Sequence, residues 1–325
     1  MIFCTTDFTL PYLNFAAEYY LATRKHFDED VFMLWRNEPS VIIGRYQNAY
    51  EEVNLEYIKE KGIHLARRMS GGGTVYHDLG CWEFTFITEK ADENIEFERF
   101  MNPIAEALRK LGLDVRITGR NDIMLYPDGG ERGYKISGNT QYKKGNVTVH
   151  HGTLLFDTDI EEMVKSTTPA EYKITSKAIK SVRERVTNIR KWLSNDMTGE
   201  EFARRIGTYM TDSEYILNEE DLAAIYELKD FFESRKWIYG ETPAFDIKKT
   251  VSFEGGTLEF GFTVKKGIIV SAGLSGDFFS SDDPDLDAAL SGVEFSPEEV
   301  SSALKRNCSG IFKFDIDETV RKIFS

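Results

Sequence analysis

The chain has 325 residues, of which 41% are hydrophobic and 29% are charged, and 40 Lys and Arg against 54 Asp and Glu give a formal net charge of −14 at pH 7. This composition supports a packed core and excludes general disorder. The acidic balance offers no basic surface to a nucleic-acid backbone, so we expect no nucleic-acid partner. The length favours a main domain of about 200 to 250 residues with a small companion.

The cysteines and the hydropathy pattern indicate the compartment. Only Cys4, Cys81 and Cys308 occur, far apart in the sequence, and this spacing predicts neither a disulfide framework nor a paired zinc motif. The N-terminal residues lack the basic start and apolar run of a signal peptide. No segment approaches about 18 uninterrupted apolar residues, so we expect no membrane contact and a cytoplasmic protein.

The N-terminal part predicts a helix followed by two strands. Apolar residues recur at helical spacing over residues 10–25, which predicts an amphipathic helix with its polar side in solvent. The runs VFMLW (31–35) and SVIIG (40–44) are typical of strands, and a turn-like segment ending at Pro39 separates them. We therefore predict that these two runs pair as a hairpin.

The middle of the chain predicts a second helix and a second hairpin. A helical period over residues 95–111 ends at Gly112, a suitable C-terminal cap. The runs YKISGNTQY and VTVHHGTLLFD flank a Lys-Lys-Gly-Asn turn, which predicts an antiparallel pair. This pairing would place Lys135 almost opposite Thr153 and Leu154.

The last part of the chain changes from helical to alternating sequence. Residues 196–237 are rich in helix-forming residues. Beyond Pro243, an alternating segment with glycine-containing turns predicts a three-stranded meander, and Ser296 followed by Pro297 opens a last helix. We predict two domains, residues 1–244 and 245–325.

A motif scan excludes several common sites. No glycine precedes a lysine anywhere in the chain, so the triplet at Gly71–Gly73 is not a phosphate loop. The triplet also lacks the third glycine of a dinucleotide fingerprint, because Tyr76 stands there. Neither His-Glu-x-x-His nor Gly-x-Ser-x-Gly occurs, which excludes the corresponding metalloprotease and hydrolase patterns.

The densest cluster of candidate site residues runs from Arg67 to Gly80. Three successive glycines expose backbone N–H groups that can surround a carboxylate or phosphate. On a strand, Arg67 and Arg68 would point to opposite faces, so that one faces an anion while the other stays in water. A mobile surface turn is the competing interpretation of a glycine triplet, but the flanking Arg, Ser, Thr and His favour a site.

Two further clusters lie at residues 119–122 and at Lys135 with its small neighbours. A lysine is usually a solvated side chain, but beside small residues its ammonium group provides a compact charge for phosphoryl or carboxylate oxygens. His150 and His151 should face opposite sides of a strand. The plainest interpretation is one core and one surface histidine.

Five strings in order, RRMSGGGTVYHDLG, GRNDI, KISGN, HHGTLLFDTD and SVRERVTNI, resemble bacterial lipoate-protein ligases of the long form, in the superfamily of biotin protein ligases and octanoyl transferases. The resemblance covers the whole chain. It implies an α/β (α+β) catalytic domain with mixed and antiparallel sheets and flanking helices at 1–244, and a small α+β accessory domain at 245–325. It also implies two reactions: lipoate and Mg-ATP give lipoyl-AMP and pyrophosphate, and a lysine of an apo lipoyl domain then takes the lipoyl group.

The resemblance assigns roles by position. Lys135 matches the lysine that contacts the substrate carboxylate and the phosphate, and Arg68 is expected to hold phosphate or adenylate. Asp122 matches an adenylate-site position; Mg is expected to be bound mainly through phosphates, with Asp122 as a candidate ligand. Residues 177–188 resemble a mobile adenylate-binding segment. The other expected binding residues for ATP, lipoate or lipoyl-adenylate are Ser70, Gly71, Gly72, Gly73, Thr74, Val75, Tyr76, His77, His151, Gly152 and Thr153.

The resemblance also implies partners and leaves two alternatives open. The expected acceptors are apo lipoyl domains of 2-oxoacid dehydrogenase acyltransferase subunits and the glycine cleavage H protein. An octanoyl or lipoyl transferase, or an amidotransferase, would need an activated cysteine, and none of the three cysteines lies where the related transferases carry theirs. A non-catalytic lipoyl-binding regulator is disfavoured by Lys135 and Arg68. Cys81 replaces an Asn usual in the family, so a polar contact is missing or remade.

Overall fold

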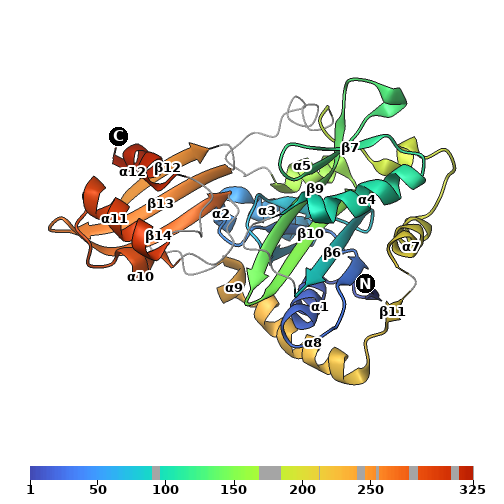
Figure 1. The fold of residues 1–325 in the computed structure, drawn as a ribbon, viewed down its shortest axis with the longest axis horizontal. Coiled ribbons are helices and arrows are strands. Elements are labelled where there is room, and N and C mark those ends of the chain that lie inside the picture. The colour runs from blue at the N-terminus through green and yellow to red at the C-terminus, as the bar shows by residue number, and fades with distance from the viewer. Residues whose placement is uncertain are drawn as a thin grey trace.

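The computed structural model describes residues 1–89, 96–167, 184–211, 213–239, 246–253, 256–277, 285–308 and 315–324. An eight-stranded sheet forms the centre of the N-terminal part (Figure 1). The first three strands across it are parallel, and every later neighbouring pair is antiparallel. In sheet order the strands are β11 (Glu214–Tyr215), β1 (Ile2–Thr5), β2 (Val31–Trp35), β6 (Cys81–Thr88), β10 (Val147–Leu155), β9 (Tyr134–Lys144), β8 (Asp122–Leu125) and β7 (Val115–Thr118).

A smaller sheet has the order β4 (His64–Arg67), β3 (Ser40–Ile43) and β5 (Val75–His77). The predicted hairpin of residues 31–35 with 40–44 is therefore wrong, because β2 belongs to the large sheet and β3 to the small one. Every residue of both strands is buried. Burial on both faces requires cover on both faces, which two separate sheets and their helices provide, and the turn before Pro39 links the sheets rather than closing a hairpin.

Helices cover both faces of the large sheet. On one face, α1 (Pro11–Thr23) and α8 (Glu219–Glu233) share a core with Met33 and Trp35 of β2. On the other face, α4 (Glu98–Lys110) and α7 (Gly199–Met210) share a core with the alternate residues of β2 and β6. Among its described residues, the N-terminal part also contains the helical segments α2 (Ala49–Glu52), α3 (Leu55–Lys61), η1 (Pro127–Gly129), α5 (Ile160–Thr167), η2 (Ile189–Trp192) and α9 (Arg235–Tyr239).

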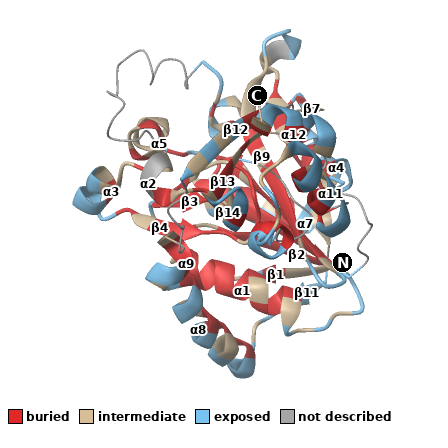
Figure 2. Cartoon of the chain, turned by 90° about the vertical axis from the view of Figure 1, so that its left-hand side faces the viewer, coloured by how far each residue is buried: buried red, intermediate tan, exposed pale blue. Residues whose placement is uncertain are grey.

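The first helix occupies the predicted residues but has no polar side in solvent. Asn14 and Glu18 are 0% and 1% exposed, and Figure 2 shows α1 buried along most of its length. The prediction of a solvated face was wrong because α8, distant in sequence, packs against α1. By contrast, α4 is confirmed: it ends before Gly112, whose φ of +89° suits a glycine cap.

The hairpin of β9 and β10 is confirmed, but its register differs from the prediction. Lys144 pairs with Val147 across a two-residue turn in which Gly145 has a φ of +59°. The prediction assumed a four-residue turn. The shorter turn brings Thr153 beside Gly138, whose N–H donates to the Thr153 hydroxyl at 3.1 Å, and Lys135 instead pairs with Met124 of β8.

The C-terminal part has its own sheet and core. The predicted meander is present as β12 (Ile247–Phe253), β13 (Gly256–Lys265) and β14 (Ile268–Asp277), covered by α10 (Leu286–Leu290), α11 (Pro297–Asn307) and α12 (Ile316–Phe324). The helix predicted after Ser296 is confirmed as α11. The boundary at residue 244 lies outside the described residues, so the division into 1–244 and 245–325 stays a prediction. Within the described ranges, no helix has the length and apolar character needed to cross a membrane.

Candidate functional site

A cavity of about 360 Å³ lies between the large and small sheets. Its wall combines the glycine-rich segment, strands of the large sheet and the edge of the C-terminal sheet. Three predicted site residues, Ser70, Gly71 and Tyr76, are not part of this wall. The predicted residues that line the cavity are Arg68, Gly72, Gly73, Thr74, Val75, His77, Asp122, Lys135, His151, Gly152 and Thr153.

The glycine-rich loop packs tightly against the end of β3. A Cβ atom on Gly44 would lie 2.0 Å from the carbonyl oxygen of Gly72, so no other residue fits there without a backbone shift. Gly72 has a φ of +91°, which a residue with a side chain rarely adopts. The loop is therefore a fixed turn rather than the mobile surface turn considered as the alternative.

Arg68 holds the shape of this loop from inside. Its guanidinium group donates to the carbonyl oxygens of Gly71 (2.7 Å), Gly73 (2.8 Å) and Ile42 (3.3 Å), and to the Ser70 hydroxyl (3.1 Å). Burial lowers the pKa of Arg68 to about 10, so the side chain remains cationic at neutral pH. A positive charge thus lies in the cavity wall, although most of its donors serve the loop.

Arg67 points to the opposite face, as predicted, but it is not in water. It is 4% exposed and donates to the carbonyl oxygens of Gly44 (2.8 Å) and Gln47 (2.7 Å) on one side and of Ile238 (2.6 Å) on the other. The prediction of a solvated arginine was wrong because α9 covers this end of β4. Arg67 instead ties the small sheet to the helical segment before the C-terminal part.

Lys135 and Asp122 form an ion pair at the open end of the cavity. The Lys135 Nζ lies 2.7 Å from the Asp122 Oδ1, and the two side chains are 39% and 31% exposed. A Cβ atom on Gly138 would lie 3.2 Å from the Lys135 Nζ, so the absence of a side chain there leaves room for the lysine. The Lys135 N–H donates to the carbonyl oxygen of Arg185 at 2.8 Å. Of the predicted segment 177–188, residues 177–183 lie outside the described residues.

His151 belongs to a buried chain of polar groups. Its Nδ1 lies 2.8 Å from the Glu18 Oε2, and its Nε2 lies 2.7 Å from the Ser70 Oγ. His150 faces the other side of β10 and stacks on Phe100, with ring centroids 4.8 Å apart. The opposite directions were predicted correctly, but the prediction of one surface histidine was wrong, because His150 and His151 are 0% and 3% exposed. Burial lowers the pKa of His150 well below its usual value.

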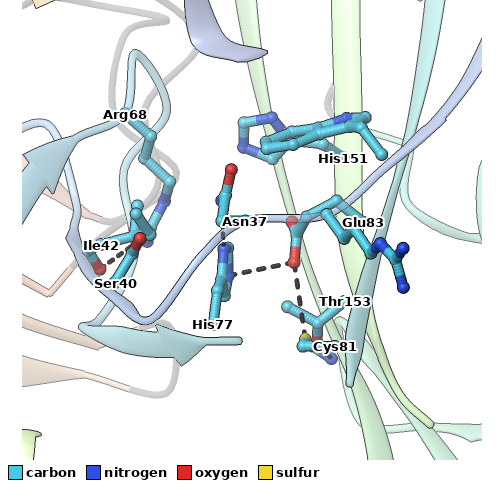
Figure 3. A network of polar contacts seen from close by, with 12 residues as sticks. Asn37, Ser40, Ile42, Arg68, His77, Cys81, Glu83, His151 and Thr153 are labelled. Atoms are coloured by element: carbon cyan, nitrogen blue, oxygen red, sulfur yellow. Dashed lines mark hydrogen bonds and ion pairs between the residues drawn. The ribbon is translucent and has the colours of Figure 1, made fainter. Parts of the chain in front are cut away.

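His77 and Glu83 form a second buried polar group in the cavity wall (Figure 3). The His77 Nε2 lies 3.0 Å from the Glu83 Oε1, and the Cys81 thiol donates to the same oxygen at 3.8 Å. Burial, aided by the charge of Arg68, lowers the pKa of His77 to about 3. Burial and the nearby Glu18 raise the pKa of Glu83 well above its usual value. Both shifts favour the neutral form of the group.

Sequence reasoning missed part of the cavity wall. The sequence held one signal for Glu83: it is the only charged residue in the strand-like run CWEFTFIT. All eight residues of this run are buried in the structure. Cys81 is buried behind Glu83 and does not line the cavity, and burial raises the pKa of its thiol. The other lining residues that had not been predicted are Phe15, Ile42, Asn139, Thr140, Gly256 and Asp277.

The C-terminal sheet reaches the cavity at its glycine-rich side. The Gly276 N–H donates to the carbonyl oxygen of Tyr46 at 3.0 Å. The Asp277 Oδ2 would lie 3.2 Å from a Cβ atom on Gly73, and Asp277 and Gly256 both line the cavity. Across the part of the chain that the structure covers, no cluster of three or more His, Cys, Asp or Glu residues is arranged to bind a metal ion.

Comparison with known proteins places this geometry in a family. Residues 10–211 match the lipoyl protein ligase A/B catalytic domain, and residues 242–322 match the bacterial lipoate protein ligase C-terminus. Lipoate-protein ligase 1 of Staphylococcus aureus is 39% identical over 305 residues, covering 92% of this chain and 91% of the relative. The lipoate-protein ligase LplJ of Bacillus subtilis is 35% identical over 305 residues, covering 91% of this chain and 90% of the relative.

Solved structures agree with this assignment. The P. falciparum LipL1 structure in complex with lipoate has a TM-score of 0.79 and 26% identity and covers 98% of both chains. A T. acidophilum bipartite lipoate protein ligase, studied with its E2 lipoyl domain, has a TM-score of 0.65 and 26% identity and covers 76% of this chain and 98% of its own. A lipoate-protein ligase A bound with ATP has a TM-score of 0.60 and 26% identity and covers 74% of this chain and 100% of its own.

The predicted fold class, a mixed α/β catalytic domain of the biotin/lipoate ligase type with a small C-terminal domain, is confirmed by the whole-chain structural match and the C-terminal family match. The chain therefore belongs to the lipoate-protein ligase family, whose members attach lipoate to apo-proteins at the expense of ATP.

Proposed function

We propose that this ligase forms lipoyl-AMP within the cavity between its two sheets and then transfers the lipoyl group to a lysine of an apo lipoyl domain. The observation that supports this proposal most strongly is the uneven distribution of charged and apolar residues around the cavity. One end holds Lys135, Asp122 and Arg120, whereas Phe15 and Ile42 contribute apolar wall elsewhere. Such a cavity suits a substrate with an anionic head and an apolar tail.

In the first step, a carboxylate oxygen of lipoate attacks the α-phosphorus of ATP, and pyrophosphate leaves. The two reactants are both anions, so their approach requires positive charge between them. Lys135 supplies this charge from a partly exposed position, where its ammonium group can leave Asp122 for the incoming oxygens. Arg68 adds a fixed charge in the wall and keeps the backbone N–H groups of the loop in place.

In the second step, the amine of the acceptor lysine attacks the acyl carbon of lipoyl-AMP. An amide bond forms, AMP leaves with the electrons of the C–O bond, and the amine loses a proton. The mixed anhydride is already activated, so no protein nucleophile is needed. The buried cysteines fit this view, because burial raises the pKa of Cys4 to about 12 and raises the pKa of Cys81 and Cys308 as well.

Magnesium fits the site only as a partner of the nucleotide. Asp122 is the acidic residue of the large sheet at the Lys135 end of the cavity, and Mg²⁺ commonly uses one or two carboxylates together with substrate phosphates. We propose that Mg²⁺ is held by the phosphates with Asp122 as a protein ligand. When bound, it would offset the negative charge of the phosphate oxygens.

We further propose that the protein works in the cytoplasm. We propose as its acceptors the lipoyl domains of 2-oxoacid dehydrogenase acyltransferase subunits and the glycine cleavage H protein. The study of a related ligase together with its E2 lipoyl domain supports the first group of acceptors.

Lipoate-dependent exchange of labelled pyrophosphate into ATP tests the first step. We expect exchange with the wild-type protein and almost none with Lys135→Ala. Lys144→Ala is the matched control, because Lys144 is an exposed lysine on the same strand. Exchange that is absent from the wild type, or equally fast in Lys135→Ala and Lys144→Ala, contradicts the proposal.

A further inference from the structure

Two polar side chains in the cavity wall have no part in the proposed chemistry. His77 and Glu83 are 2% and 4% exposed, and both line the cavity. A polar group in such a position costs free energy unless it finds a partner. Their hydrogen bonds therefore indicate what kind of substrate group this part of the wall recognises.

The surrounding amides fix the proton on the His77 ring. The Asn14 Nδ2, a donor with two hydrogens, lies 3.0 Å from each of three oxygens: the carbonyl oxygens of Phe8 and Arg36 and the Asn37 Oδ1. The Asn37 oxygen is thereby used as an acceptor, and its Nδ2, 3.0 Å from the His77 Nδ1, must be the donor. The neutral ring consequently accepts at Nδ1 and carries its proton on Nε2.

This proton position determines which oxygen of Glu83 carries the acid proton. The Glu83 Oε1 accepts from the Cys81 thiol and lies 3.0 Å from the protonated Nε2 of His77, so Oε1 is the acceptor oxygen of the neutral acid. The proton of the carboxylic acid is then on Oε2. Among the described residues, Oε2 has no hydrogen-bond partner, and the His77 Nε2 makes no hydrogen bond of good geometry. In Figure 3 the free oxygen lies on the side of the carboxyl group away from the Cys81 sulfur.

The distance between this donor and Lys135 suits an acyl chain. Glu83 pairs with Thr153 on the next strand, and Thr153 lies beside Gly138 on the strand after that. Neighbouring strands are about 4.8 Å apart, so Glu83 lies about 10 Å across the sheet from Gly138. The Lys135 ammonium group lies next to Gly138. A medium-length acid with its carboxylate at Lys135 would bring its tail to Glu83.

We propose that Glu83, positioned by His77, selects the acyl tail by donating an O–H hydrogen bond to a sulfur atom of the dithiolane ring. This inference rests on the proposed function and adds its substrate preference. An all-carbon tail such as octanoate would cover this donor without giving it a partner, and would be disfavoured for that reason. When a buried donor loses a weak acceptor such as a thioether sulfur, the lost hydrogen bond typically lowers a rate constant by about five- to thirtyfold.

The test is the ratio of kcat/KM for lipoate to kcat/KM for octanoate in the pyrophosphate exchange assay. We expect the wild type to favour lipoate by about five- to thirtyfold. Glu83→Leu should bring the ratio close to one, mainly by improving octanoate, because the leucine has no donor to satisfy. Glu83→Gln should keep the preference, because its amide N–H can donate from the same place. Lys144→Ala, whose exposed side chain lies outside the cavity wall, is the control and should leave the ratio unchanged.

A lipoate analogue with methylene groups in place of both sulfurs separates hydrogen bonding from ring shape. We expect the wild type to treat this analogue like octanoate, and this measurement needs no folded variant. Equal kcat/KM for lipoate and the carbocyclic analogue, or a ratio unchanged in folded Glu83→Leu, overturns the role of Glu83 while leaving the ligase activity in place. Absence of exchange with lipoate in the wild type would instead contradict the proposed function itself.

Discussion

Replacing Lys135 by alanine should remove most of the adenylation activity while leaving the fold intact. The lysine forms an ion pair with Asp122 at 2.7 Å, and both side chains are about one-third exposed. Ion pairs with this much solvent contact contribute only about 0 to 1 kcal/mol to folding. A large loss of activity with a small loss of stability is therefore the expected pattern.

The size of the loss follows from the contact that is removed. Removing one preorganised charge-assisted contact to the reacting oxygens typically costs about 2.7 to 4 kcal/mol, or about 100- to 1000-fold in rate. Asp122→Asn should cause a separate loss, because an amide is a poorer ligand for Mg²⁺ than the carboxylate that it replaces.

Single-turnover formation of lipoyl-AMP measures both effects, with Lys144→Ala as the control. Circular dichroism and urea unfolding would establish that each variant is folded. A folded Lys135→Ala protein within a few-fold of the wild-type rate would refute the role of the lysine. Asp122→Asn at the wild-type rate would show that this carboxylate does not hold the metal.

Three further results are expected. Arg68→Lys should lower the free energy of unfolding by about 1 to 3 kcal/mol and weaken ATP binding, because lysine cannot replace the planar donors to Gly71 and Gly73. Urea unfolding measures the first effect and calorimetry the second. No change in either quantity would show that the loop does not depend on the guanidinium group. The pKa of Glu83 is raised above the ordinary 4.5, so the unfolded chain releases this proton first and the wild type loses stability as pH rises above that value. Glu83→Gln, which cannot titrate, should lose less stability between about pH 5 and pH 8. Parallel curves of unfolding free energy against pH for the two proteins would contradict the pKa shift. A fragment of residues 1–244 should retain adenylation but transfer lipoate poorly to an apo lipoyl domain until the C-terminal piece is added, because Asp277 and Gly256 help to line the cavity. Normal transfer by the fragment alone would show that the C-terminal part is not needed for the second step.

Local patterns predicted the elements with strong boundaries. The helix ending before Gly112, the meander of the C-terminal part and the helix after Ser296 each depend on turns or caps that neighbouring residues specify. The sequence did not reveal which strands share a sheet. Runs such as 31–35 and 40–43 are apolar on both faces, and nothing in their own residues distinguishes a hairpin from two strands in different sheets.

The residues that line the cavity were predictable only where they stand in recognisable local strings. Lys135, Asp122 and the glycine-rich segment stand in recognisable strings, and the structure brings them to one cavity. Glu83 and Asp277 were missed because their place in the wall depends on long-range packing. Arg67 was expected in water for a similar reason: its partners at residues 237 and 238 are distant in sequence, so only the folded chain shows that it is buried.

Mass spectrometry of an apo lipoyl domain incubated with this protein, ATP, Mg²⁺ and lipoate tests the ligase activity directly. We expect a mass gain of one lipoyl group, which requires ATP and is lost when the acceptor lysine of the lipoyl domain is changed to arginine. Lys135→Ala should give no gain on the time scale of the wild-type reaction, while Lys144→Ala should give the full gain. No lipoylation by the wild type, or lipoylation that proceeds without ATP, would contradict ATP-dependent attachment of lipoate by this protein.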